Sequence, residues 1–158
     1  MIQAHELDPA AFSRFGSVIR AEGTLRWING GRCARYHALA EIDTAGPAGI
    51  SLFRSEPVPD PVKIDLMERH PLGSQAFLPL SLAPFLVVVA EDAGGAPGAL
   101  RAFVTAPGEG VSYARNIWHA VLMPLGAPQD FAVVDYVGDE PNLEEHRLRA
   151  PVAVALTR

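Results

Sequence analysis

The sequence predicts a mainly β protein, a barrel or two-sheet sandwich with a few short helices. Short apolar or alternating segments follow one another along most of the chain, and glycine and proline clusters separate most of them. No helical pattern of about ten or more residues lies between them, as a parallel α/β sheet would require. A length of 158 residues, 49% of them hydrophobic, predicts one domain over residues 1–158 with a core of its own.

The clearest helix signal lies near the start of the chain. Asp8 is typical of an N-cap, Pro9 suits the first helical position, and Gly16 is a common stop, so a short helix is expected within residues 8–16. Strands are expected after it, each a short apolar or alternating run. They are residues 17–20, 35–39, 50–54, 62–66, 76–80, 85–90, 100–104, 117–122 and 131–137.

The segments between and after these strands contain no domain boundary. Residues 91–98 are polar and glycine-rich, which is typical of a loop, and residues 106–110 have the Pro-Gly composition of a tight turn. The tail from residue 144 onward is too short to form a second domain. We therefore expect one structural unit.

Composition limits the possible cellular location of the protein and its redox chemistry. The longest apolar run, residues 85–90 with its flanks, falls far short of the roughly 20 residues that cross a bilayer. Residues 1–6 lack the basic region followed by an apolar one that marks a secretory signal. Cys33 is the only cysteine, so an intrachain disulfide is excluded. These features predict a cytoplasmic protein with no membrane partner.

The net charge of the chain limits the kinds of molecule that it can bind. A formal charge of −5 argues against nucleic acid, because sequence-independent binding to phosphates depends on clustered cations. A small anionic substrate is still compatible, since a few arginines focused in one pocket outweigh a mildly negative surface. Four arginines lie in or beside expected strands, where a guanidinium needs either solvent or an anion, and guanidinium binds carboxylate with two hydrogen bonds. They are Arg35, Arg54, Arg69 and Arg115.

Two histidines stand out by their surroundings. A lone histidine is more often structural than catalytic, and His5 and His146, near the termini, keep that interpretation. His70 and His119 each lie at a strand edge beside an arginine and a turn. His37 is intermediate, because it follows Arg35 and Tyr36 on an expected strand.

The stretch around His70 resembles the first motif of cupin barrels, in which two histidines and an acid hold a divalent metal. The match is incomplete, because Leu72 occupies the second-histidine position and Gln75 the acid position. His119 follows a Pro-Gly turn and a short strand, where the second cupin motif supplies its histidine. His70, Gln75 and His119 would be a weak shell for zinc or iron, which prefer three imidazole, thiolate or carboxylate donors. Metal dependence is therefore open, and histidine can also act directly as acid or base.

Nearly the whole chain, from Ala11 to about Asp135, resembles the ureidoglycolate lyase family of small cupin-like enzymes. Five ordered blocks carry the resemblance: Ile28-Asn29-Gly30-Gly31, Arg35-Tyr36-His37, Glu68-Arg69-His70-Pro71-Leu72-Gly73-Ser74-Gln75-Ala76-Phe77-Leu78-Pro79, Leu100-Arg101-Ala102-Phe103, and Gly110 to His119. The chain departs from the family at Ala38, where an aspartate is expected, and at Ala114 and Ala120, where some relatives carry histidines.

The resemblance implies a cupin-like fold and cleavage of (S)-ureidoglycolate to glyoxylate and urea in allantoin (purine) breakdown. It also implies a homodimer and a divalent metal, with nickel the ion to name for the family. The chemistry suits the residues, because removing the hydroxyl proton while protonating the departing nitrogen yields an aldehyde and urea without a nucleophile. No Ser-His-Asp or Cys-His arrangement is evident around Cys33.

Roles follow for the residues of these blocks. The acid and base roles are expected of His70 and His119, directly or through a metal held by His70, Gln75 and His119. Glu68 is an alternative base, and Gln75 and Tyr113 are expected to orient the ureido group. The substrate-binding set is Arg35, Arg69, Arg115, Gln75 and His37. Strand alternation puts Glu68 and His70 on one face and Arg69 on the other, which is in tension with a binding role for Arg69.

Three alternatives stay open at this stage. A ureidoglycolate amidohydrolase would release ammonia in place of urea. A non-catalytic cupin-like module would bind a small carboxylate such as glyoxylate, although no effector domain accompanies it. A metal-dependent cupin oxygenase or isomerase is disfavoured by the missing ligand at Leu72.

Overall fold

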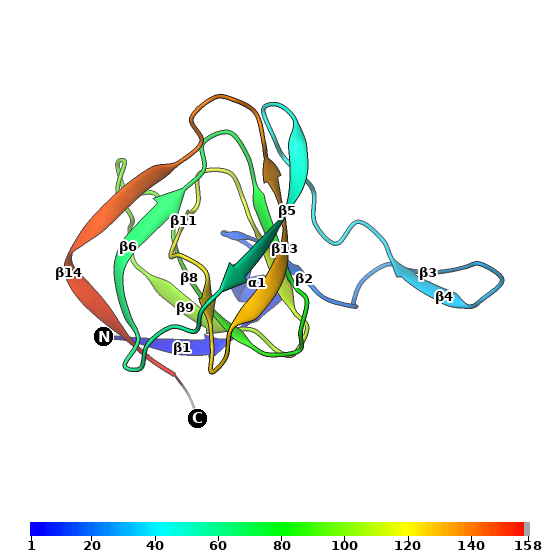
Figure 1. Ribbon diagram of the computed structural model, residues 1–158, viewed down its shortest axis with the longest axis horizontal. Helices are drawn as coiled ribbons and strands as arrows, with labels where there is room; N and C mark the ends of the chain where they lie inside the picture. The colour runs from blue at the N-terminus through cyan, green and yellow to red at the C-terminus, as the bar shows by residue number, and fades with distance from the viewer. Residues whose placement is uncertain (157–158) are drawn as a thin grey trace.

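A ring of six strands forms the centre of the protein, for which a computed structural model describes residues 1–156 (Figure 1). Around the ring the order is β11-β6-β14-β1-β9-β8, and β8 pairs back onto β11 to close it. The short β12 continues along β8. The bounds are β1 (Ile2–Glu6), β6 (Lys63–Arg69), β8 (Phe85–Ala90), β9 (Arg101–Val104), β11 (Trp118–His119), β12 (Met123–Pro124) and β14 (Glu144–Ala155).

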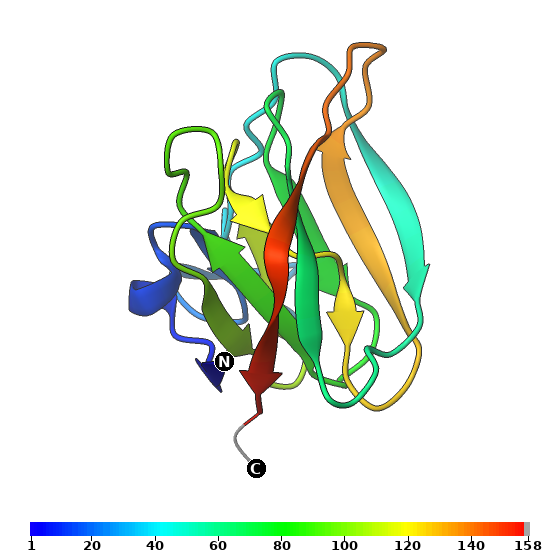
Figure 2. The ribbon, with the colours of Figure 1, turned by 90° about the vertical axis from the view of Figure 1, so that its left-hand side faces the viewer.

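A second sheet of five strands packs against one side of this ring, in the order β2-β10-β7-β13-β5. Figure 2 shows β5 and β13 side by side at one edge, with β6 and β14 beside each other in the ring. The bounds are β2 (Gly16–Ile19), β5 (Ala48–Ser55), β7 (Gln75–Pro79), β10 (Gly110–Tyr113) and β13 (Gln129–Tyr136). A mainly β, cupin-like fold is thereby confirmed.

Strand β8 has buried side chains on both faces and separates two hydrophobic clusters. Val87 and Val89 join a cluster with Phe12 and Phe131 between the ring and the second sheet. The alternate residues of β8 join a second cluster with Trp118 on the opposite face. The run of apolar residues in β8 therefore reflects burial on two sides. Strand β11, which pairs with β8, likewise has one face toward each cluster.

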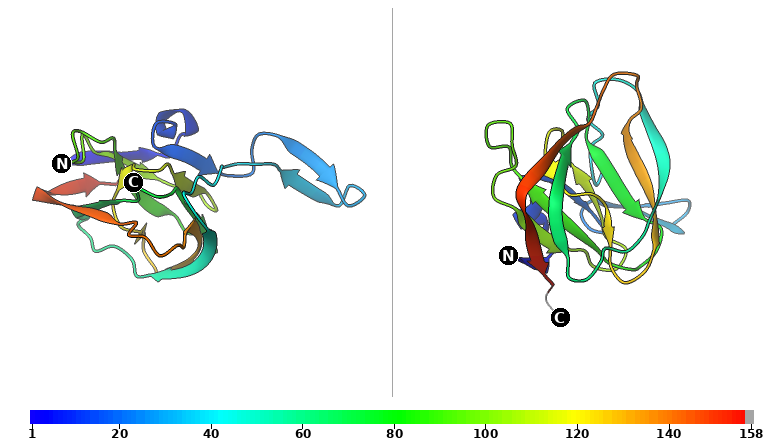
Figure 3. Two further views of the ribbon diagram at one scale, coloured as in Figure 1. Left: turned by 90° about the horizontal axis from the view of Figure 1, so that it is seen from above. Right: turned by 60° about the vertical axis from the view of Figure 1, so that its left-hand side comes forward.

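A two-stranded hairpin, β3 (Leu25–Ile28) and β4 (Cys33–Tyr36), leaves this body and projects away from it (Figures 1 and 3). The turn at its tip has Asn29, Gly30 and Gly31 at φ values of +54°, +67° and +81°. Two of these three residues are glycine, which adopts positive φ without steric cost. We refer to residues 24–37 as the arm.

The helix within residues 8–16 is shorter than expected. Helix α1 spans only Pro9–Phe12, with Asp8 accepting a hydrogen bond from the Ala11 amide at 2.8 Å as the predicted N-cap. Gly16 does not merely end the helix but begins β2, opposite Tyr113. Within the described residues, no helix is long and apolar enough to span a membrane.

Several strands lie outside the segments expected from the sequence. The two terminal strands were missed: β1 pairs in parallel with both β9 and β14, so the two ends of the described chain are neighbours in the ring. Strand β14, in the tail, is the longest strand of the described chain. The expected strand at residues 117–122 contracts to β11, which has two residues.

Candidate active site

Three groups with acid-base or metal-binding chemistry meet between the ring and the second sheet. Glu68 on β6 is the cross-strand partner of His119 on β11, and His119 is the partner of Val89 on β8. Cross-strand partners share a face, so Glu68 and His119 point to the same side as Val89. His70 follows β6 by one residue and stays on the face of Glu68, as alternation predicts. One ring nitrogen of each histidine and one Glu68 carboxylate oxygen all lie within 4.8 Å of one another.

The His70 ring is oriented by a residue that lies far away in the sequence. Its Nδ1 is 2.7 Å from the backbone carbonyl oxygen of Asn142. Because a carbonyl oxygen only accepts, Nδ1 carries the proton in the neutral ring and Nε2 presents a lone pair. The side chain of Asn142 also accepts a hydrogen bond from the Leu72 amide at 2.7 Å, which fixes the turn after His70.

The His119 ring is buried and held on two sides. It stacks on Tyr113 of β10, with centroids 4.2 Å apart and planes 5° from parallel, and its centroid lies 5.2 Å from that of His70. Its Nδ1 is 3.1 Å from the carbonyl oxygen of Ala120 and 3.9 Å from Glu68 Oε1. The same reasoning assigns the proton to Nδ1 and a lone pair to Nε2.

Three buried atoms of the site have no hydrogen-bond partner among the described residues: His70 Nε2, His119 Nε2 and Gln75 Oε1. Gln75 lies on β7 opposite Tyr113, and its amide nitrogen donates to Asp135 at 2.9 Å. That contact leaves the amide oxygen as the free end. Buried polar atoms without partners are costly, so three at one place indicate a site built to bind something. Two imidazole nitrogens with carbonyl and carboxylate oxygens nearby fit a divalent transition metal.

Burial and mutual repulsion set the protonation states of the site. Burial, with a further contribution from the charge of His70, lowers the pKa of His119 to about 3, so this ring is neutral at physiological pH. Burial raises the pKa of the Glu68 carboxyl, against the opposing influence of His70. Burial and the nearby Glu68 also raise the pKa of Tyr113, so it stays a neutral phenol. The site therefore holds a neutral His119 ring, a neutral Tyr113 phenol and the Glu68 carboxyl group, whose side chain is 21% exposed.

Arg69 lies on the opposite face of β6 from the site. Its guanidinium bonds Glu144 at 2.6 Å and Asp92 at 2.8 Å and lies 4.5 Å from the centroid of the Trp118 ring. Trp118 in turn donates from its indole nitrogen to Asp92 at 2.9 Å. Arg69 can therefore bind substrate only by giving up these partners.

Arg115 lies near His70, since the amide of the next residue, Asn116, donates to the His70 carbonyl oxygen at 3.1 Å. Its guanidinium already makes two bonds to the Asp43 carboxylate, of 3.2 and 2.6 Å. A substrate carboxylate would compete with Asp43 for the same guanidinium nitrogens of Arg115.

Arg35 and His37, also expected to bind substrate, lie elsewhere. Arg35 is on β4 in the projecting arm and His37 follows that strand, so the chain does not bring them to its own histidine pair (Figure 1). Among the aromatic residues near these segments, Tyr113 borders the site by stacking on His119. Trp118 packs on the opposite side of β11, and Trp27 lies on the arm.

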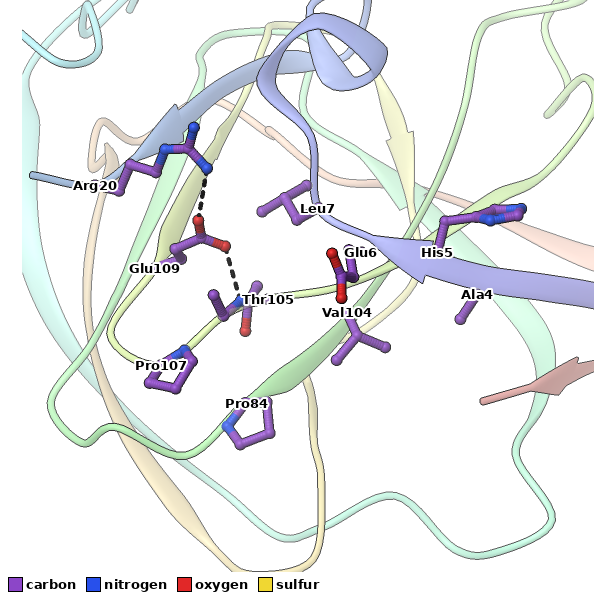
Figure 4. Close-up of a pocket in the computed structure, with 11 residues that line it drawn as sticks. Ala4, His5, Glu6, Leu7, Arg20, Pro84, Val104, Thr105, Pro107 and Glu109 are labelled. Carbon is purple, nitrogen blue, oxygen red and sulfur yellow. Dashed lines mark hydrogen bonds and ion pairs between the residues drawn. The ribbon is translucent and has the colours of Figure 1, made fainter. Parts of the chain in front are cut away.

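A cavity of about 830 Å³ lies apart from the histidine pair, beside β1 and the loop after β9 (Figure 4). Two of its charged residues already bind each other, because Glu109 bonds Arg20 at 3.0 Å and also accepts from the Ala106 amide at 2.8 Å. None of the site residues lines it. We therefore place the chemistry at the histidine pair.

The residues that support the site were not found from the sequence. Asn142 and Asp135 reach it from the loop after β13 and from β13 itself. Asp43 reaches Arg115 from the loop after the arm. No local motif marks them, because each acts on a partner more than 50 residues away.

Comparisons with known proteins identify the family of the chain. The family model described as ureidoglycolate lyase matches residues 1–155. A ureidoglycolate lyase of Rhodobacter capsulatus is 54% identical over 151 residues, which cover 94% of each chain. One of Mesorhizobium japonicum is 52% identical over 148 residues, 91% of each chain, and one of a Chelativorans strain is 48% identical over 159 residues, 98% of this chain and 96% of its own. The chain belongs to the ureidoglycolate lyase family.

Proposed function

We propose that this protein cleaves (S)-ureidoglycolate to glyoxylate and urea. The observation that supports this most is the meeting of Glu68, His70 and His119 within 4.8 Å, in a chain whose curated relatives carry the name ureidoglycolate lyase. The site has the acid-base groups that such an elimination requires, and no nucleophile is needed.

The proposed reaction balances without a further reactant. The substrate carbon carries a carboxylate, a hydroxyl and a ureido nitrogen. A base removes the hydroxyl proton, the oxygen forms a carbonyl, the carbon–nitrogen bond breaks, and its electron pair leaves on nitrogen, which takes up a proton. The products are glyoxylate and urea. One group that accepts the first proton and returns it to nitrogen is sufficient.

We assign that proton transfer to Glu68. Its carboxylate faces both imidazole rings and keeps partial contact with solvent. Tyr113 is a neutral phenol and a hydrogen-bond donor, and Gln75 offers a free amide oxygen; both suit the ureido group.

His70 and His119, with Gln75, would hold a divalent cation through the three atoms that lack partners. The resemblance to the family names nickel. When bound, such an ion lowers the pKa of a coordinated hydroxyl and stabilises negative charge on oxygen. The Nδ1 contacts of both rings to backbone carbonyls support this assignment, because metal-binding histidines are commonly oriented in that way.

We further propose that the protein acts in allantoin breakdown, in the cytoplasm and as a homodimer. Supporting features are the family membership and the lone, free Cys33. A reducing compartment suits a chain with no disulfide.

Incubating the purified protein with racemic ureidoglycolate, with and without added nickel, manganese or zinc, tests the proposal. Urea and glyoxylate are expected in equal amounts, from one enantiomer only. Ammonia in place of urea would instead identify an amidohydrolase. If none of these products forms with any metal, both enzymatic interpretations fail, and thermal stabilisation by glyoxylate without turnover would favour a binding module.

A further inference from the structure

The arm has no core of its own. Its two strands pair only with each other, and Figure 1 and the view from above in Figure 3 both show it extending away from the body. An isolated two-stranded hairpin is marginally stable in water, so one that projects freely needs a surface to pack on.

The two faces of the arm differ in chemistry. Leu25 and Trp27 lie on one face with Tyr36, and the Trp27 ring is 63% exposed. On the other face Arg26 stands directly opposite Arg35. Like charges directly opposite each other destabilise a hairpin. Neither arginine has an ion pair among residues 1–156. A negatively charged group from another molecule would relieve their mutual repulsion.

The charge of the arm is complementary to the body of the same protein. Residues 24–37 contain three arginines and no acidic residue. The remainder of the chain then has ten basic against eighteen acidic residues, a formal charge of −8. A second copy of this chain is therefore an electrostatic match for the arm.

A second copy also offers an apolar surface. Ile50 and Leu52 on β5 are 80% and 63% exposed and lie on the outer face of the second sheet, with the small Ala132 beside Leu52. The arm leaves the body on the side where β5, β13 and β2 lie (Figure 1). Two copies that meet through this side would cover Leu25 and Trp27 on each arm.

Among residues 1–156, both arginines of the body expected at the candidate active site are already paired with carboxylates. Arg69 is bound to Glu144 and Asp92, and Arg115 is bound to Asp43. A guanidinium supplied from elsewhere would bind a substrate carboxylate without first breaking one of these ion pairs. The four residues of each strand of the arm alone span about 13 Å, at about 3.3 Å per residue, and the turn at the tip extends the arm further.

We propose that the arm of each protomer packs on its partner, and that Arg35, with Arg26 beside it, binds the substrate carboxylate in the partner's site. The identity of the ligand rests on the proposed function, whereas the packing of two copies does not. Each site would then combine the histidine pair of one protomer with the arginine pair of the other.

Heterodimers of two defective chains test this directly. One chain carries Arg26→Ala and Arg35→Ala, the other carries His119→Ala, and co-expression with two different tags allows the mixed dimer to be purified. The mixed dimer has one site with both an intact arm and an intact histidine pair, so about half of the wild-type turnover per dimer is expected. Turnover no higher than the mean of the two defective homodimers would overturn the proposal.

The reciprocal dimer is the matched control. It pairs a wild-type chain with a chain carrying all three changes, so no site combines an intact arm and an intact pair if the arm serves its partner. Nearly complete loss of turnover is expected, whereas half of the wild-type value would show that each arm serves its own chain. Arg14→Ala, an exposed arginine on the loop after α1, controls for loss of positive charge.

Sedimentation separates failure of the arm from failure of the enzymatic function. The wild-type protein is expected to sediment as a dimer, and the double variant Leu25→Asp, Trp27→Asp as a folded monomer with an unchanged far-UV spectrum. A monomeric wild type, or a dimer that the double variant leaves intact, would overturn the arm proposal even if urea release proved absent.

Discussion

His70 and His119 reach the site from different strands, yet the protein holds both rings in the same way. Each Nδ1 contacts a backbone carbonyl oxygen, at 2.7 Å for His70 and 3.1 Å for His119. That contact fixes the tautomer and leaves both Nε2 atoms as acceptors.

Replacing either histidine by alanine is expected to lower turnover by roughly a hundredfold or more, as loss of a positioned ligand or base does. The bound metal is expected to fall with it, as measured on the purified variants. His5→Ala, an exposed histidine on β1, is the control. A near-normal rate in either variant would refute the role given to that residue.

Glu68→Gln separates proton transfer from metal binding. The change keeps the size of the side chain but removes its basicity, so turnover is expected to fall by roughly a hundredfold. The metal content is expected to stay at the wild-type level. If metal and turnover are lost together, Glu68 is a ligand and the proton passes elsewhere.

Of the three alanines expected to depart from the family pattern, Ala38 is the one with an unusual backbone conformation. Its φ of +51° lies in the left-handed region, which alanine adopts at a cost of about 1 kcal/mol or more and aspartate tolerates better. Ala38→Gly is therefore expected to stabilise the protein by about 1 kcal/mol in urea denaturation. A loss of stability would show that this strain does not exist in solution.

At the scale of elements, the two faces of β6 and β11 divide the chemistry. Glu68 on β6 and His119 on β11 point toward the second sheet. Their chain neighbours Arg69 and Trp118 point to the opposite side. Alternation predicted this separation for Glu68, Arg69 and His70 from the sequence alone. The partners of Arg69 could not be predicted, since Glu144 lies on a strand that the sequence did not reveal.

The pairing of β2 with β10 requires glycine at one position. A Cβ on Gly16 would lie 1.8 Å from the Ser112 carbonyl oxygen, so Gly16→Ala forces the two strands apart. A loss of more than about 1 kcal/mol of unfolding free energy is expected. Gly23→Ala is the matched control, because Gly23 has a positive φ but open space around it. Equal losses in both variants would mean that backbone strain, not the contact, decides the cost.

At the scale of the whole molecule, sequence reasoning reached the fold class and the histidine pair but not what surrounds the pair. Short punctuated strands predict a barrel because they leave no room for crossover helices. The strands β1 and β14 could not be predicted from the sequence, because their apolar residues face one side of a ring that only the complete fold closes. Arg35 was found as a strand residue, but nothing local indicates that its strand leaves the body.

One measurement tests the central claim, that the histidine-pair site breaks the carbon–nitrogen bond of ureidoglycolate. Substrate labelled with ¹³C at the ureido carbon is incubated with the metal-loaded protein and followed by NMR, with His119→Ala alongside. The label is expected to appear in urea with the wild type and to stay in the substrate with the variant. Label appearing in bicarbonate, or in urea at equal rates for both proteins, would contradict it.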